Sequence, residues 1–526
     1  MSGPSTNSDV AARDDAHLRS LGIKPELQRT LGFLSNFAVA FSYISVSTGT
    51  FTLMYLGMQV GGPAFFWSWP IVVLGQTFVA LNFAELASHF PVAGSIYQWS
   101  KRLTNKTLGW FTGWFYFWAG LLTVTAVAAT VPLVLSSIFG FKLSDPSPVP
   151  GLNNLIFWGL VSLVTSTVIN VIGVRVLSLV NNLGVAAEIL GMVVFAVILL
   201  IVGRHQDFSV LTQTASVETP ETGGYLPVFA IAMFMSLFVI YGFDTAGTFG
   251  EETIDAGRQA PRGILSAIWV SGAIGAIFLL AIILATPDLE ASKTDFSPIA
   301  TSIQAGLGST WGNVYLYVLL VAIYVCVTAI QGATARLLFS MGRDGRFPGG
   351  SLWGSVNHTF KTPFNASVAV GVLAAIPFFF TDSPALLAAG ATGLIYLSYF
   401  MANLGVFAAR RKGWPHKGAW FSLGSWGMII NLAALVYGGV MVINFALWKN
   451  PIFGNFGTAL RDNTNPSLTL LTSGGKPISF LPDFPFFEAT VGLILIGGAI
   501  YYFATGQGRK VDTVEADALT GEAVIA

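Results

Sequence analysis

The chain is dominated by long apolar runs that are separated by short polar or charged segments. A run of about 20 apolar residues is long enough to cross a bilayer as a helix. The pattern therefore predicts an all-α membrane protein with twelve transmembrane helices. The predicted helices cover residues 34–58, 64–88, 109–140, 153–173, 177–203, 226–250, 264–286, 312–341, 364–381, 384–409, 424–448 and 486–505.

Small polar residues interrupt two of these helices, the first at 45–49 and the sixth at 241–247. Inside a bilayer, backbone that leaves the helix must be buried in protein or line a cavity, because no water is available to satisfy it. Interrupted helices at corresponding places in the two halves of a chain are typical of the central binding site of a transporter. The pattern thus favours a protein that carries a small solute across a membrane.

Composition supports the membrane class and argues against several other classes. Hydrophobic residues make up 53% of the chain and charged residues 10%, whereas soluble domains carry about 25% charged residues. The 26 basic and 26 acidic residues balance, so nucleic acid is not an expected partner. The single cysteine, Cys326, excludes a disulfide within the chain and is interpreted as a small buried hydrophobe.

No pattern in the sequence points to an enzyme. The five histidines are scattered over tails, loops and helix ends, without metal-ligand spacing or a nucleophile motif. A phosphate-binding loop of an ATP-driven pump is also missing from the sequence. We therefore expect no catalytic residues, no metal site and no cofactor.

The distribution of basic residues predicts the orientation in the membrane. Most lysines and arginines fall in the segments that share a side with the N-terminus, and positive residues concentrate on the cytoplasmic side. We therefore expect a multi-pass protein of the cell membrane with both termini in the cytoplasm. Residues 1–30 and 506–526 are predicted to be cytoplasmic tails, both mobile, and residues 450–485 to be an external loop.

Three segments resemble signatures of the amino acid–polyamine–organocation (APC) transporters. They are Ala84-Glu85-Leu86-Ala87-Ser88 continuing to Tyr97, Gly242-Phe243-Asp244 continuing to Glu251-Glu252 and Ala260-Pro261-Arg262, and Arg336 continuing to Met341-Gly342-Arg343-Asp344-Gly345 and Pro348. Ala335 and Gly342 depart from the last signature. Residues 61–70 look most like the branch that carries amino acids, γ-aminobutyrate and choline.

The resemblance implies a LeuT-like fold of two inverted five-helix repeats that works by alternating access. The repeats would be residues 31–203 and 226–410, with two additional helices within 424–505. In this family the substrate binds where the interrupted helices 1 and 6 meet. We therefore place the candidate substrate-binding residues at the two breaks: Tyr43, Ile44, Ser45, Ser47, Thr48, Gly49, Tyr241, Phe243, Asp244 and Thr245.

The first break suits an amino acid. Amide groups at the start of a half-helix attract a carboxylate, and Ser47, Thr48 and Gly49 would supply them together with hydroxyls. Carbonyls near Tyr43, Ile44 and Phe243 could accept from an ammonium group. Small residues that merely allow close helix packing are the alternative.

The second break carries an aromatic and an acidic candidate. The resemblance gives Phe243 the position of a gate that closes over substrate, and Tyr43 and Tyr241 could add cation–π contact to a quaternary ammonium. Asp244, an acid within a membrane helix, could contact a substrate amine, take up protons, or cap the second half of helix 6.

Glu188 in the fifth helix has no basic neighbour in the sequence. By the resemblance it stands where many related permeases carry a lysine that contacts the first break, so the role of that lysine cannot be carried over. A buried carboxylate suits proton uptake, and Glu188 is our candidate for coupling. Neutralising a cationic substrate and a purely structural role remain alternatives.

Several charged residues of the matched motifs lie near the predicted cytoplasmic face and are candidates for an inner gate: Glu85, Glu251, Glu252, Arg336, Arg343 and Asp344. Ion pairs among them could hold one state and release in another. Sodium coupling would need hydroxyls on the eighth helix, for which Thr328 and Thr334 are available.

The sequence thus predicts a secondary transporter that imports an amino acid or a related amine such as γ-aminobutyrate, coupled to protons. A carrier of choline, ethanolamine or a polyamine, an exchanger, and a nutrient sensor built on a transporter fold are the alternatives.

Overall fold

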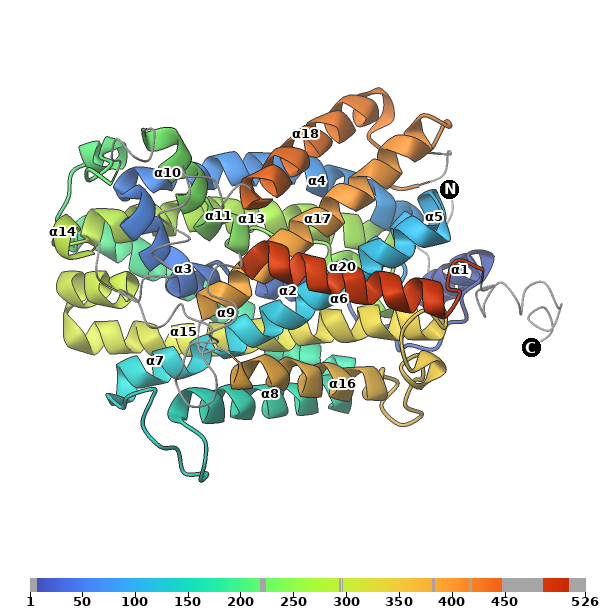
Figure 1. Ribbon diagram of the computed structural model, residues 1–526, viewed down its shortest axis with the longest axis horizontal. Coiled ribbons are helices and arrows are strands. Elements are labelled where there is room, and N and C mark those ends of the chain that lie inside the picture. The colour runs from blue at the N-terminus through green and yellow to red at the C-terminus, as the bar shows by residue number, and fades with distance from the viewer. Residues whose placement is uncertain are drawn as a thin grey trace.

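The computed structural model describes residues 7–217, 224–292, 295, 297–380, 384–415, 419–446 and 486–509. In these residues the fold is all-helical, with two isolated β-bridges and no strand. Figure 1 shows most of the long helices running between two opposite ends of the molecule. One continuous hydrophobic core joins them.

Nine stretches in the described residues are long and apolar enough to cross a membrane. They are α2 with α3 (Phe33–Ile44, Val46–Gly61), η1 with α4 (Pro63–Trp67, Ser68–His89), α6 with α7 (Lys106–Ala128, Thr130–Phe139), α8 (Asn154–Ile172), α9 (Val174–Val202), α13 (Ala256–Ala285), α15 (Pro298–Arg343), α17 (Pro384–Arg410), and η7 with α18 (Gly424–Trp426, Gly427–Ala446). Each coincides with one of the predicted helices, which confirms the all-α membrane class.

The three other predicted helices coincide with shorter apolar helices. They are α10 with α11 (Tyr225–Ala232, Phe234–Val239), α16 with η6 (Phe364–Ala375, Ile376–Phe379), and α20 (Phe486–Ala504). Helix α15 consists of two helices that meet at a kink at Gly308, where φ is 79°. The part after the kink coincides with the predicted eighth helix, and the part that begins at Pro298 was not predicted.

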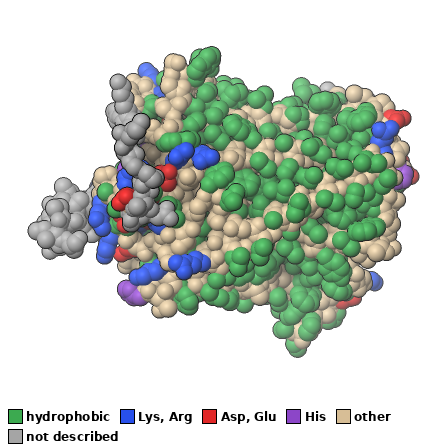
Figure 2. Space-filling view, turned by 180° about the vertical axis from the view of Figure 1, so that it is seen from behind, with side chains coloured by type: hydrophobic (Ala, Val, Ile, Leu, Met, Phe, Trp, Pro, Cys, Tyr) green, Lys and Arg blue, Asp and Glu red, His purple; other side chains and the backbone are tan. Residues whose placement is uncertain are grey.

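Helix α9 illustrates how these helices face lipid. Leu183 and Leu190, both 64% exposed, lie on its outer side, whereas Glu188 is 2% exposed and Met192 1%. In a bilayer the exposed leucines would lie against lipid, and the inward side carries the polar residue. Figure 2 shows hydrophobic side chains over the middle of the molecule and charged side chains towards its ends.

The first predicted break is a single residue. Ser45, with φ 33° and ψ 83°, lies between α2 and α3 in the left-handed region, which costs a non-glycine residue about 1–3 kcal/mol. The second break runs from the end of α11 at Val239 to the start of α12 (Thr245–Thr248), with Gly242 at φ 88°. The residues between the two helices are 240–244, so the break begins one residue earlier than predicted and ends three residues sooner.

The expectation of a mobile N-terminal tail is wrong for the described residues. Helix α1 (Asn7–Ser20) lies against one end of the molecule (Figure 1). Leu18 and Ile23 pack on Val92, and Arg13 pairs with Asp255 at 2.6 Å. The tail packs here because its apolar residues contact Phe90 and Val92 in the segment that follows α4.

The last described turn of α20 lies at the same end of the molecule as α1 (Figure 1). We call this end, which also carries residues 250–255, the α1 end. The predicted external loop at 450–485 and the tail residues 510–526 lie outside the described residues.

Besides α1, the sequence analysis missed two short α-helices. Helix α5 (Ser95–Leu103) follows α4 at the α1 end, and α14 (Leu289–Ser292) precedes α15. Both are too short to resemble a membrane helix.

A candidate substrate site between two interrupted helices

The two breaks pack directly on each other. The ring of Tyr43 in α2 covers Gly242, where an added Cβ would lie 1.9 Å from Tyr43 Cδ1. Gly49 in α3 packs on Val239 in the same way, with 2.6 Å from its hypothetical Cβ to Val239 Cγ2. The absence of side chains on these two glycines lets the interrupted backbones approach, as the prediction of a shared site requires.

A small cavity lies beside the contact between the breaks. Its lining consists of Tyr43, Ile44, Thr48, Gly49, Thr123, Val127, Phe238, Tyr241, Cys326 and Ile330. Five of the predicted site residues are among them, namely Tyr43, Ile44, Thr48, Gly49 and Tyr241. The lining carries hydroxyls, one thiol and apolar groups but no charge.

The other five lining residues were not predicted. They come from α6, α11 and α15 and have no feature in the sequence that sets them apart from ordinary helix residues. Cys326 was interpreted as a buried hydrophobe; it is buried, and its Sγ also lies 3.6 Å from the carbonyl oxygen of Tyr43. Thr123 lies 3.2 Å from the hydroxyl of Tyr241.

Glu188 of α9 reaches the first break. Its Oε1 accepts hydrogen bonds from Ser45 Oγ at 2.9 Å, from Ser47 Oγ at 2.7 Å and from the backbone N–H of Ser47 at 3.2 Å. Ser47 therefore directs its amide and its hydroxyl to a carboxylate, as predicted for an amino acid substrate, but the carboxylate belongs to the protein.

A chain of hydroxyls joins Glu188 to the cavity. Ser45 Oγ lies 2.6 Å from Thr48 Oγ1. Because the single proton of Ser45 points to Glu188, Thr48 is the donor to Ser45. Thr48 lines the cavity, so a change at Glu188 can reach the cavity through two hydrogen bonds.

Asp244 lies in a second polar cluster. Its carboxylate accepts from the hydroxyls of Tyr399 at 2.5 Å, Tyr116 at 2.7 Å and Ser95 at 3.0 Å. Although Asp244 precedes α12, its side chain makes no capping hydrogen bond to that helix. The capping interpretation is therefore wrong, because three hydroxyls from other helices hold the carboxylate instead.

Tyr399 also ties the second break to α17. Its hydroxyl accepts the backbone N–H of Gly242 at 2.9 Å while it donates to Asp244. The Tyr399 hydroxyl thus satisfies the Gly242 N–H, which the break leaves without a helical partner, and it also orients the Asp244 carboxylate.

The remaining predicted residues of the second break lie away from the cavity lining. Phe243 is fully buried against Phe83 and Tyr399, with ring centroids 6.2 and 5.5 Å apart. Thr245 is buried as well. The gate role of Phe243 stays a prediction.

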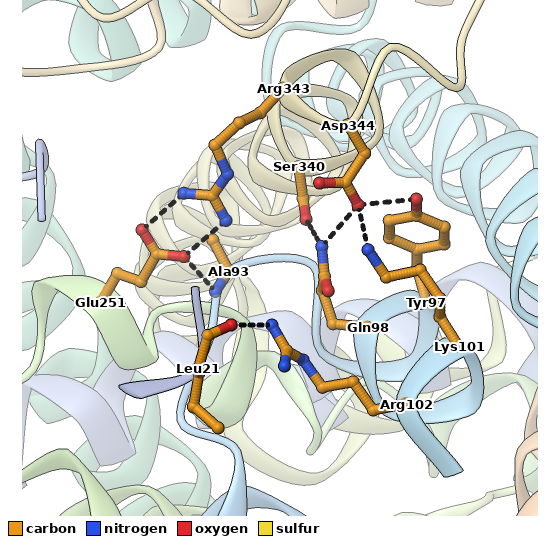
Figure 3. A network of polar contacts seen from close by, with 10 residues as sticks. All are labelled: Leu21, Ala93, Tyr97, Gln98, Lys101, Arg102, Glu251, Ser340, Arg343 and Asp344. Carbon is orange, nitrogen blue, oxygen red and sulfur yellow. Dashed lines mark hydrogen bonds and ion pairs between the residues drawn. The ribbon is translucent and has the colours of Figure 1, made fainter. Parts of the chain in front are cut away.

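The predicted inner-gate residues form two of the expected ion pairs at the α1 end. Arg336 donates to both oxygens of Glu252 at 2.9 Å, and the two side chains are 0% and 1% exposed. Arg343 pairs with both oxygens of Glu251, which also accepts the N–H of Ala93 at 3.0 Å (Figure 3). These pairs join α15 to the segment that follows the second break.

Asp344, the other motif residue that we considered for the inner gate, forms a third link. Its Oδ2 accepts from Lys101 at 2.7 Å, Tyr97 at 2.8 Å and Gln98 at 2.9 Å, all in α5 (Figure 3). Burial opposes the charged form of Asp344, but Lys101 and Arg343 outweigh it and lower the pKa of this carboxyl. Asp344 therefore stays ionised and holds α5 against α15.

Glu85 does not join the other predicted gate residues. It pairs with Arg410 at the end of α17 and accepts the N–H of Leu423 at 2.8 Å. We chose Glu85 from its motif, but its partner lies outside the three matched segments and could not be identified from them.

The two threonines considered for sodium donate to their own helix. Thr328 Oγ1 bonds to the carbonyl of Tyr324 at 2.9 Å, and Thr334 Oγ1 to that of Ile330 at 2.8 Å. Across the described residues, no group of three or more His, Cys, Asp or Glu side chains could hold a metal ion.

Comparison with known proteins agrees with this architecture. The amino-acid permease BAT1 of Arabidopsis thaliana is 28% identical over 485 residues, covering 85% of this chain and 91% of BAT1. The branched-chain amino acid permease BcaP of Lactococcus lactis subsp. cremoris is 25% identical over 384 residues, covering 70% of this chain and 79% of BcaP.

Among solved structures, MhsT in complex with L-phenylalanine superposes with a TM-score of 0.58 at 15% identity, covering 80% of this chain and 99% of MhsT. This likeness shows a shared fold. A family model described as amino acid permease matches residues 31–471. Because that match spans most of the chain, the protein belongs to the amino acid permease family of the APC superfamily.

Proposed function

We propose that this chain is a secondary active transporter that imports an amino acid or a related amine such as γ-aminobutyrate, with one or more protons. The observation that carries the proposal is the contact of the two helix breaks beside a cavity, with Tyr43 on Gly242. Unwound backbone buried within a membrane protein is tolerated beside such a cavity and is the usual place of a transporter's substrate.

The relatives support an amino acid as substrate. BAT1 and BcaP are amino acid permeases by name, and MhsT holds L-phenylalanine. The cavity lining of this chain suits the side chain of a neutral amino acid, because it offers hydroxyls and apolar surface without a charge. The substrate would enlarge this cavity by moving the helices that enclose it.

Alternating access would use the ion pairs at the α1 end as the inner gate. The buried pairs Arg336–Glu252 and Arg343–Glu251 would hold this end closed. Opening it would require α15 and the segment after the second break to separate. The fold behind this motion would be twelve membrane helices, arranged as two inverted five-helix repeats with two additional helices.

The orientation belongs to the same proposal. On the face in Figure 2, most lysine and arginine side chains gather towards the α1 end. Positive residues favour the cytoplasmic side, so this end would face the cytoplasm of a cell-membrane protein, with both termini inside.

Proton coupling would run through Glu188. This carboxylate is buried, contacts the first break and has three hydroxyl or amide donors. A buried carboxylate near no cation is a natural proton acceptor. Phe243 would act as a gate over the substrate. Asp244 and Thr245 would contact the substrate from the second break.

A second candidate function is transport of a cationic amine such as choline, ethanolamine or a polyamine. The observation in its favour is Glu188, since an uncompensated acid beside the cavity could pair with an ammonium group. An exchanger and a sensor would bind substrate at the same site. The exchanger would carry the bound substrate across the membrane, whereas the sensor would not.

Counterflow in proteoliposomes tests the proposal. Vesicles loaded with unlabelled amino acid should take up labelled amino acid beyond equilibrium, and an inward proton gradient should raise net uptake. Counterflow of choline alone would support the cationic alternative. Binding without any counterflow would support a sensor and contradict the proposal.

A further inference from the structure

Glu188 occupies the position that an amino acid's carboxylate needs. The half-helix α3, 16 residues long, directs the N–H of Ser47 and two hydroxyls towards the first break. All three donors end on Glu188 Oε1. A substrate carboxylate that uses Ser47 must therefore take donors away from Glu188.

The surroundings give an ionised Glu188 no other stabilising charge. Helix α9 packs against α2, α8, α13 and α15. The titratable or charged side chains on these neighbours are Tyr43 on α2, Tyr315, Tyr317, Tyr324, Cys326, Arg336 and Arg343 on α15, and Arg258 and Arg262 on α13, with none on α8. Of these, Tyr315 and Cys326 are the ones that interact with Glu188 electrostatically.

The arginines of these helices are engaged elsewhere. Arg262 lies over the ring of Phe33, and Arg258 over that of Trp420. Arg336 and Arg343 are held by Glu252 and Glu251. Within the described residues, Glu188 makes no ion pair with a basic side chain.

Two carboxylates at one half-helix terminus, without a basic side chain of the protein between them, repel each other and compete for the same donors. A proton on Glu188 removes both obstacles. The neutral carboxyl holds Ser45 and Ser47 more weakly, because hydrogen bonds to an ionised acceptor are about twice as strong as those to a neutral one. The released donors can then turn to the substrate.

We propose that Glu188 is a built-in competitor for the substrate's carboxylate, so that zwitterionic amino acids bind only the protonated form. Amines that lack a carboxylate bind the ionised form, in which Glu188 supplies the counter-charge. This inference rests on the proposed function and adds to it that the substrate's chemical class decides whether a proton accompanies it. In each zwitterion binding event, one proton from water is transferred to a carboxylate oxygen of Glu188.

The two ligand classes should therefore show opposite pH dependence. Above the pH at which Glu188 ionises, the Kd of a zwitterion should rise about tenfold per pH unit, as linkage to one proton requires. The Kd of a monovalent amine should fall on raising the pH through the same range and then level off.

The test uses the full-length protein in detergent with L-leucine and 3-methylbutylamine, which differ only by the carboxyl group. Binding is measured by isothermal titration calorimetry from pH 5.5 to 8.5, in two buffers of different ionisation enthalpy, so that proton uptake is counted directly. We expect uptake of about one proton per leucine at high pH and none for the amine.

The variant Glu188→Gln should bind leucine with a Kd that no longer depends on pH, and it should bind the amine more weakly. Glu290→Gln makes the same change at an exposed site in α14 and should behave as the unmodified protein. Where Glu188→Gln does not fold, the proton count on the unmodified protein decides alone.

Leucine binding with no proton uptake over the whole pH range would overturn the inference, and so would an unchanged pH slope in Glu188→Gln. Either result leaves the proposed function standing, because leucine still binds. Counterflow of neither amino acids nor amines, by contrast, contradicts the proposed function itself.

Discussion

The ring of Tyr43, next to the first helix break, lies directly against Gly242 in the second break, where an added Cβ would lie 1.9 Å from Tyr43 Cδ1. Gly242 also has φ 88°, which a residue with a Cβ rarely adopts. Both features make this glycine the tightest point of the candidate site.

Gly242→Ala should therefore reduce transport at least tenfold, because its Cβ would force Tyr43 away from the second break. The measurement is counterflow at a saturating amino acid concentration. Gly140→Ala is the matched control, since Gly140 has φ 72° but open space around its Cβ position. Equal losses in both variants would assign the effect to backbone strain alone.

Removing one partner of the buried Arg336–Glu252 pair should destabilise the α1 end strongly. Arg336→Met leaves the Glu252 carboxylate buried without its cation, and losing one partner of a buried pair costs about 3–5 kcal/mol. Thermal unfolding in detergent should show a clearly lower midpoint. The double variant Arg336→Met with Glu252→Gln should recover part of the loss.

A surface pair provides the comparison for that measurement. Arg204 and Asp207 lie 3.6 Å apart and are 42% and 86% exposed. Arg204→Met should cost less than about 1 kcal/mol, because water screens such pairs. A midpoint as low as that of Arg336→Met would contradict the assignment of stability to the buried pair.

Tyr399→Phe removes one donor to Asp244 and the acceptor of the Gly242 N–H. A buried group left without a partner costs about 1–3 kcal/mol, and here the cost falls on the second break. We expect a lower maximal transport rate. The unfolding midpoint should fall less than it does in Arg336→Met. Tyr317→Phe, at a 49% exposed site on α15, should change neither quantity.

The docking of α1 can be tested by charging its apolar contact. Leu18→Asp places a carboxylate between Ile23 and Val92 and should detach the helix. Hydrogen exchange should then increase at Asp255 in the segment 250–255, because the Asp255 N–H donates to Asp14 of α1 at 2.8 Å and Arg13 of α1 pairs with the Asp255 carboxylate. Ala16→Asp adds the same group on the exposed side of α1 and should leave exchange unchanged.

Sequence patterns were sufficient for the helices and for the two breaks. Apolar length locates a membrane helix because lipid imposes the same requirement on each one. The breaks stood out because small polar residues are costly in that setting unless a cavity compensates. The motif residues Glu251, Glu252, Arg336 and Arg343 could likewise be selected as an inner gate.

The pairing of side chains from distant segments was beyond the sequence. Glu85 meets Arg410, and Asp244 meets Tyr116 and Tyr399, because helix packing brings together residues hundreds of positions apart. The same applies to Thr123 and Cys326 in the cavity lining, which resemble any other residue of their helices.

The sequence by itself determined the class of the protein, the position of its helices and the place where two of them are interrupted, since these depend on local hydrophobicity and backbone chemistry. The tertiary structure alone decided what lies at the first break. Glu188 and Ser47 are separated by 141 positions, and only the packing of α9 against α2 and α3 places a carboxylate on the amide where a substrate was expected.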